Sequence, residues 1–192
     1  MPTGRRLPHH TAHRTARPLA ARAASALLAL ALPFGAAMAA DDYAPVSQML
    51  RAGRAAQALA QADRYLATRP NDPQMRFLRA QALHDTGRID EAMATYLRLT
   101  QEHPELPEPH NNLAVLLAGR HQLEAARAAL EAALRANPSY ATAHENLGDI
   151  QLRLALQSWA RARELDPGLS TVAPKLAAAR ALLQAPASAA PR

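Results

Sequence analysis

The chain has 192 residues, with 22 basic and 16 acidic side chains, 49% hydrophobic residues and no cysteine. The absence of cysteine excludes disulfide bonds, zinc–thiolate sites and thiol catalysis, so packing alone must hold the fold together. Only two phenylalanines and one tryptophan are present, and we therefore expect a core built from alanine and leucine, which suits closely packed helices.

Residues 1–39 have the form of an export signal. Five arginines and no acidic residue precede or flank an apolar run that ends in small residues, which predicts cleavage after Ala39. An uncleaved membrane anchor is the alternative, but the run is short for a spanning helix and contains Pro33. The pair Arg5-Arg6 leaves both the general and the twin-arginine export routes open.

Removal of this signal changes the charge of the protein. It carries five of the 22 basic residues and none of the 16 acidic ones, so residues 40–192 are close to neutral. Binding to nucleic acid requires a clustered basic face on the folded domain, and we expect no nucleic-acid partner. Of the 22 basic residues, 21 are arginine, a bias that we attribute to a GC-rich genome and that favours a bacterial origin.

Four prolines recur at the ends of similar alanine-rich stretches. They are Pro70, Pro104, Pro138 and Pro167, spaced by 34, 34 and 29 residues. Proline cannot continue a helix and also disfavours helical geometry in the residue before it. A fixed period of this length predicts a stacked array of helical hairpins, because one hairpin is too small to bury its own apolar face.

On this period the chain resembles the tetratricopeptide repeat family, most clearly in GRIDEAMATYLRLTQEHPE, residues 87–105. The family places small residues where the two helices of a repeat cross, larger residues four positions later in the second helix, and glycine at the turn. The small residues are Ala80, Ala114 and Gly148 in first helices and Ala58, Ala92 and Ala126 in second helices; the later positions hold Tyr96, Leu130 and an undersized Ala62; the glycines are Gly53, Gly87 and an early Gly119.

The resemblance implies an all-α fold, a right-handed superhelical array of helix-turn-helix repeats. We place the repeats at about 41–72, 73–106 and 107–140, followed by a shortened fourth at 141–169. A helix at 170–184 is expected to cap the array, with 185–192 as a disordered tail.

The fourth repeat departs from the family pattern. It is five residues short, and residues 150–165 contain neither glycine nor proline. The two helices of this repeat either fuse into one long helix or meet at a tight turn near residues 153–156. We predict the tight turn, because Trp159 and Ala162 fall at the family's packing positions for a second helix.

The histidines and carboxylates do not form a recognisable catalytic or metal-binding motif. His103 lies at a helix end, whereas His110 and His144 occupy the slot where the family usually has tryptophan, one repeat and roughly 10 Å apart, too far to share an ion. His144-Glu145 begins like a metalloprotease helix, but the second histidine is replaced by Gly148. We expect no metal, no cofactor and no enzymatic activity.

The inner wall formed by first helices holds the candidate binding residues. In the family, an asparagine on this wall can clamp the backbone of an extended peptide, and Asn112 and Asn146 occupy that position; an amide supplies both a donor and an acceptor. Hydrogen bonding within the scaffold is the alternative. The resemblance places these further candidates on the same wall: Phe77, Gln81, His84, Asn111, Val115, Glu145 and Asp149. Phe77 and Val115 would be apolar anchors, and because no Lys or Arg is among the candidates, we expect a basic or neutral peptide.

These features predict a non-enzymatic scaffold or adaptor of the bacterial cell envelope, periplasmic or secreted, that binds a segment of a partner protein in the groove. After cleavage of the signal we expect no insertion into the membrane. A self-associating or end-stacking accessory subunit of an envelope complex is the alternative.

Overall fold

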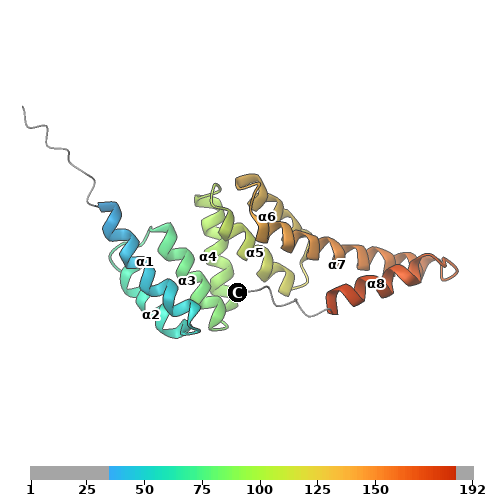
Figure 1. Ribbon diagram of the computed structural model, residues 1–192, viewed down its shortest axis with the longest axis horizontal. Helices are drawn as coiled ribbons and strands as arrows, with labels where there is room; N and C mark the ends of the chain where they lie inside the picture. The colour runs from blue at the N-terminus through green and yellow to red at the C-terminus, as the bar shows by residue number, and fades with distance from the viewer. Residues whose placement is uncertain (1–34, 185–192) are drawn as a thin grey trace, which may run out of the picture. The chain divides into compact units, whose positions relative to one another are not determined.

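The computed structural model describes residues 35–184, with side chains from Asp42 onward, as eight helices and no strand (Figure 1). Most of the predicted export signal (residues 1–34) and the predicted tail (185–192) lie outside the described residues. The helices are α1 (Gly35–Arg51), α2 (Ala55–Leu66), α3 (Pro73–Asp85), α4 (Ile89–Glu102), α5 (Pro107–Gly119), α6 (Leu123–Ala136), α7 (Ala141–Leu165) and α8 (Val172–Gln184).

The first six helices form the three predicted hairpins, and each helix packs on the next one in the chain. α3 and α5 begin with Pro73 and Pro107, positions at which the missing N–H of proline would have had no partner inside the helix. Gly53 and Gly87 close the first two hairpin turns with φ of 69° and 79°, a region that residues with a Cβ rarely adopt. In the third hairpin His121 takes this position with φ of 61°, so the expectation that Gly119 is the turn residue was wrong.

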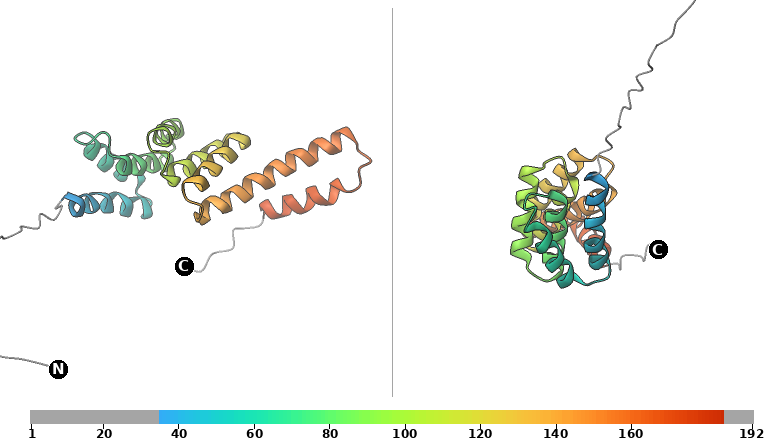
Figure 2. Two further views of the ribbon diagram at one scale, coloured as in Figure 1. Left: turned by 90° about the horizontal axis from the view of Figure 1, so that it is seen from above. Right: turned by 90° about the vertical axis from the view of Figure 1, so that its left-hand side faces the viewer.

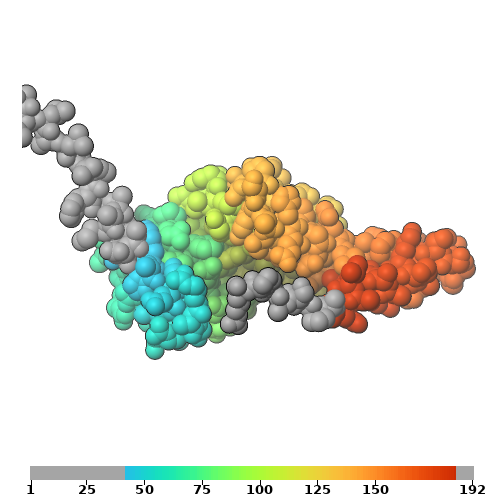
Figure 3. Space-filling view, in the orientation of Figure 1, coloured from blue at the N-terminus to red at the C-terminus, as the bar shows by residue number. Residues whose placement is uncertain are grey.

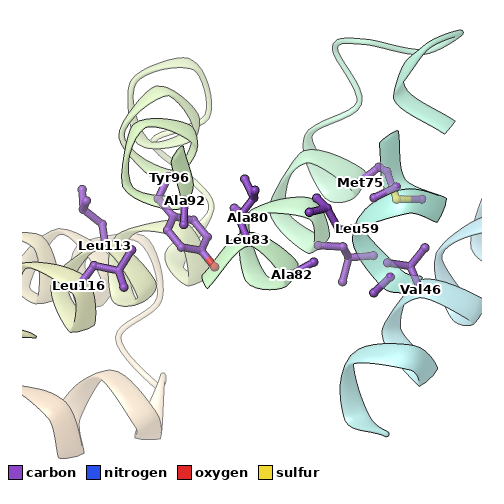
Figure 4. Close-up of a cluster of buried hydrophobic side chains, with 13 residues drawn as sticks. Val46, Leu59, Met75, Ala80, Ala82, Leu83, Ala92, Tyr96, Leu113 and Leu116 are labelled. Carbon is purple, nitrogen blue, oxygen red and sulfur yellow. The ribbon is translucent and has the colours of Figure 1, made fainter. Parts of the chain in front are cut away.

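The core follows the small residues predicted from the repeat. Ala58, Ala80, Ala92 and Ala126 are completely buried, and Ala114 is almost so. These alanines let neighbouring helices approach closely, and larger side chains such as Met75 and Tyr96 fill the space between them (Figure 4). Each buried large apolar side chain contributes about 1.5–3 kcal/mol, so packing between successive hairpins stabilises the array.

The Asp72 carboxylate joins the first three helices. Its Oδ1 accepts the N–H of Met75 at 2.8 Å and so caps α3, while Oδ2 accepts the hydroxyls of Tyr43 in α1 at 2.6 Å and Tyr65 in α2 at 2.9 Å. Burial alone would raise the pKa of this carboxyl, but the three hydrogen bonds outweigh it and hold the pKa below its ordinary value. The charged form of Asp72 therefore fixes the start of the array.

The predicted tight turn in the fourth repeat is wrong, because α7 runs as one helix from Ala141 to Leu165. Residues 150–165 are mostly good helix formers with no glycine or proline to stop the helix. Gly148 shows the consequence: beyond the neighbouring backbone of its own helix, a Cβ built there would meet no heavy atom within 4 Å. Its small size serves no helix crossing, because no second helix folds back over it.

The last helix, α8, packs against the second half of α7 and confirms the predicted capping helix. Val172, Leu176 and Ala179 form its buried face, and the Lys175 ammonium lies 5.9 Å from the centroid of the Trp159 ring. α8 runs back alongside α7 (Figure 2), and the two form the orange and red end of the array (Figure 3). Trp159 is therefore half-buried by α8 rather than by the first half of its own repeat.

Candidate functional site

Two adjoining pockets lie along the first helices of successive repeats, and together we call them the groove. The first has a volume of about 450 Å³ and is lined by α1, α3 and α5: Ser47, Leu50, Arg51, Leu78, Gln81, His84, Asp85, Asn112 and Val115. The second has a volume of about 240 Å³ and is lined by α5, α6 and α7: Ala114, Val115, Ala118, Gly119, Leu130, Asn146, Asp149, Ile150 and Arg153. Val115, whose surface is 42% exposed, belongs to both pockets.

Six of the nine predicted groove residues line these pockets. Gln81, His84 and Asn112 lie in the first pocket, Asn146 and Asp149 in the second, and Val115 in both. The repeat period places them together because α1, α3, α5 and the start of α7 present equivalent faces to the same side. Their contact with a partner remains a prediction.

The other three predicted residues lie outside the pockets. Phe77 packs on the core, with its ring centroid 5.9 Å from that of Tyr96, so its expected role as an apolar anchor lacks an open surface in the groove. Asn111 is only 4% exposed, so its side chain offers little surface to a partner. Glu145 is exposed but lines neither pocket.

A chain of three asparagines and one tyrosine runs beneath the groove. Nδ2 of Asn146 donates to Oδ1 of Asn111 at 2.8 Å, Nδ2 of Asn111 donates to Oδ1 of Asn112 at 3.2 Å, and Nδ2 of Asn112 donates to the Tyr96 hydroxyl at 3.2 Å. Burial raises the pKa of Tyr96, so this hydroxyl stays protonated. The chain connects α7, α5 and α4.

These hydrogen bonds show that the asparagines bond to other residues of the fold, which was the alternative to a peptide clamp. Each amide NH₂ has two hydrogens, so Asn112 and Asn146 keep donor capacity toward the pockets that they line. A clamp on a bound peptide remains a prediction for these two residues. Removing either side chain would also remove a scaffold hydrogen bond, which matters for the design of any test.

The groove contains two arginines, whereas the candidates predicted from the sequence include no Lys or Arg. The first pocket contains Arg51 and Asp85, and the second contains Asp149 and Arg153. Arg51 is absent from the predicted set because the predicted residues begin with the second repeat, and Arg153 is absent because a turn was expected there. Since each pocket has one arginine and one aspartate, the walls are balanced in charge.

His110 and His144, at the position where the family usually has tryptophan, support the turns between repeats. The Nε2 of His110 lies 3.3 Å from the Pro104 carbonyl oxygen, and the Nε2 of His144 lies 2.9 Å from that of Pro138. Because a carbonyl only accepts, Nε2 carries the proton in both. Burial lowers the pKa of His110 below its ordinary value. Among the described residues, no group of His, Asp or Glu side chains could hold a metal ion.

Within residues 35–184, none of the helices combines the length and the hydrophobicity that crossing a bilayer requires.

Comparison with known proteins agrees with the architecture. A family model described as "Tetratricopeptide repeat" matches residues 50–107 and 111–191. The TPR repeat-containing thioredoxin TTL4 of Arabidopsis thaliana is 39% identical over 72 residues, which cover 38% of this chain and 11% of that protein. The chain therefore spans a small part of this relative's length.

Two solved structures share the fold at low sequence identity. The thermophilic TPR protein TTC0263 of Thermus thermophilus matches with a TM-score of 0.56 and 23% identity, over 76% of this chain and 82% of that one. The type III secretion chaperone SycD of Yersinia enterocolitica, in complex with a peptide of the translocator YopD, matches with a TM-score of 0.53 and 14% identity, over 64% and 98%. By the extent of the family match, this chain belongs to the tetratricopeptide repeat family.

Proposed function

We propose that this protein is a non-enzymatic scaffold that holds an extended segment of a partner protein in the groove. The observation that carries the proposal is the continuity of the two pockets, which meet at the exposed side chain of Val115. Together they follow the first helices of four successive repeats. The tetratricopeptide fold is associated with interaction between proteins, and SycD was solved with a bound peptide.

The lining favours a neutral segment with apolar anchors. Leu50, Leu78 and Val115 supply apolar surface in the first pocket. The amides of Gln81 and Asn112 offer donors and acceptors that suit peptide backbone. Since one arginine and one aspartate line each pocket, a strongly charged segment of either sign would meet a like charge.

The test replaces Val115, which lines both pockets. Val115→Glu places a charge and added bulk between the pockets, and because the side chain is 42% exposed, the fold is expected to survive. Leu97→Glu is the matched control, since Leu97 is 48% exposed on α4 and lines neither pocket. The asparagines are poorer targets because their loss also breaks bonds to Asn111 and Tyr96.

Wild-type protein and both variants, expressed from the full sequence, would be used to capture partners from crosslinked cell extract, with thermal unfolding measured in parallel. We expect proteins captured by the wild type and by Leu97→Glu to be lost with Val115→Glu. Synthetic peptides from those proteins would then define the bound segment. The same partners on a folded Val115→Glu variant would refute the groove as the site.

We also propose that the protein is exported by residues 1–39 and acts in the bacterial cell envelope, in the periplasm or outside the cell. The arginine-rich start, the apolar run and the small residues before Ala40 support this location. Cell fractionation and N-terminal sequencing would test it. The expected mature protein begins at Ala40 and leaves the cytoplasm; a cytoplasmic protein that keeps residues 1–39 would contradict the proposal.

Self-association is a second candidate function. Leu165 and Leu169 are exposed at the turn between α7 and α8, where an array could stack on another copy. Sedimentation over a range of concentrations would detect it as a rising mass that Leu165→Glu abolishes. A constant monomer mass would exclude it.

A further inference from the structure

A second kind of pocket lies on the opposite side of α3 from the groove. It has a volume of about 280 Å³ between α2, α3 and α4, and we call it the arginine pocket. Its lining residues are Leu66, Pro70, Arg76, Arg79, Ala94, Thr95 and Arg98. On α3, Leu78, Gln81 and Asp85 face the groove, whereas Arg76 and Arg79 face this pocket, as expected for residues on opposite sides of a helix.

Two of the three guanidinium groups are held in place by carboxylates at the edge of the pocket. Arg76 pairs with Glu102, and Nε of Arg79 donates to Oδ1 of Asp63 at 2.6 Å. The side chains of Arg76 and Arg79 are only 11% and 27% exposed. Their charged ends are therefore positioned by the fold before any ligand arrives, which reduces the entropy lost on binding.

The third guanidinium group belongs to Arg98. No hydrogen bond or ion pair joins Arg98 to another residue within the described range 42–184. The hydrogen bond from Arg76 lowers the pKa of Glu102, and the charge of Arg98 lowers it further, which places Arg98 near the same carboxylate. Three guanidinium groups line the pocket, and Arg88 lies nearby in its pair with Glu91. Set against the carboxylates of Asp63, Glu91 and Glu102, these four positive groups leave an excess of one positive charge.

The chemistry of the lining indicates the class of ligand. A guanidinium group has five N–H donors in a planar fork that matches a carboxylate, and Arg79 uses only its Nε for Asp63. Leu66, Pro70 and Ala94 supply apolar surface beside these donors. We propose that the arginine pocket binds an acidic peptide segment, with a carboxylate among the guanidinium groups and an apolar neighbour against Leu66 and Pro70.

This site is separate from the groove, so one protein could hold two partner segments on opposite sides of α3. The groove, with balanced charges, suits a neutral segment, and the arginine pocket suits an acidic one. The two sites therefore differ in specificity, and each can be tested without the other.

The experiment measures fluorescence anisotropy of a fluorescein-labelled peptide, Gly-Leu-Glu-Glu-Leu-Gly with an amidated end, against the purified full-length protein. Peptides with glutamine or lysine in place of both glutamates are the ligand controls. We expect the glutamate peptide to bind and Arg98→Gln to weaken it about tenfold, as the loss of one charge-assisted hydrogen bond predicts. Because Arg98 has no partner in the described part of the protein, this variant is expected to keep the fold.

Arg127→Gln is the matched protein control. It removes one positive charge from α6, where Arg127 pairs with Glu124 and Glu131 outside the pocket, and we expect unchanged affinity. The proposal would be overturned if the glutamine peptide bound as tightly as the glutamate peptide, or if the glutamate peptide did not bind at about 1 mM. It would also be overturned if Arg98→Gln and Arg79→Gln both left the affinity for the glutamate peptide unchanged. Loss of binding in Val115→Glu with none in Arg98→Gln would assign the acidic peptide to the groove instead.

Discussion

Asn111 is expected to couple the third repeat to α7, and its replacement by alanine measures that coupling. Its side chain is buried, accepts from Asn146 at 2.8 Å and donates to Asn112 at 3.2 Å. Asn111→Ala removes both hydrogen bonds and leaves one donor and one acceptor without these partners. Water can reach the half-buried Asn112 and Asn146, so the loss in free energy of unfolding should stay near the net contribution of the two hydrogen bonds.

A hydrogen bond of this kind contributes about 1 kcal/mol, so Asn111→Ala should lower the free energy of unfolding by about 2 kcal/mol. That is a large share of the total, since domains of this size are stable by about 5–15 kcal/mol. Asn71→Ala is the control, because Asn71 is exposed and lies in a turn; a surface substitution of this type changes stability by less than about 0.5 kcal/mol.

The assay is urea unfolding followed by far-UV circular dichroism, with a double-mutant cycle through Asn146→Ala. Because Asn111 and Asn146 bond directly, the two losses should be less than additive by about 1 kcal/mol. A loss below about 0.5 kcal/mol for Asn111→Ala, or strict additivity of the two changes, would refute the reasoning that this bond ties α5 to α7.

Three further changes test other parts of the array. Gly148→Ala should raise the free energy of unfolding by about 1 kcal/mol, because alanine is the better helix former and its Cβ meets nothing within 4 Å; a loss in thermal or urea unfolding would show that another segment does pack there. Asp72→Ala should lower it by about 2 kcal/mol, since the α3 cap and two tyrosine hydrogen bonds are lost, and unchanged unfolding would contradict the role of Asp72 in joining α1, α2 and α3. The pKa of His110 is lowered in the fold, so the unfolded chain binds more protons, and the contribution of His110 to stability is present above the ordinary pKa of about 6.5 and is lost as pH falls below that value. His110→Gln should therefore flatten the pH dependence of urea unfolding below about pH 6.5. An identical pH profile in the wild type and the variant would refute this role of His110.

The position of the candidate site could be predicted from the sequence because it depends on the repeat. Once Pro70, Pro104 and Pro138 set the period, equivalent residues of first helices had to face one side, and Gln81, His84, Asn112 and Val115 do line one pocket. The small residues at helix crossings were predictable for the same reason. Local chemistry and a fixed period therefore determined the hairpins and most of the groove.

Only the tertiary structure decided the features that depend on neighbouring helices. Whether α7 breaks near residue 153 depends on the balance between helix continuation and folding back. In the structure α8 packs on the second half of α7, and the surface at Gly148, where a folded-back helix would have crossed, stays uncovered. Asn111 and Asn112 are adjacent in sequence, yet one is buried and bonded to α7 while the other lines a pocket. The arginine pocket likewise brings α2, α3 and α4 together. Burial and charge at these positions are set by contacts between repeats, and a sequence period specifies which residues are equivalent without specifying what each of them meets.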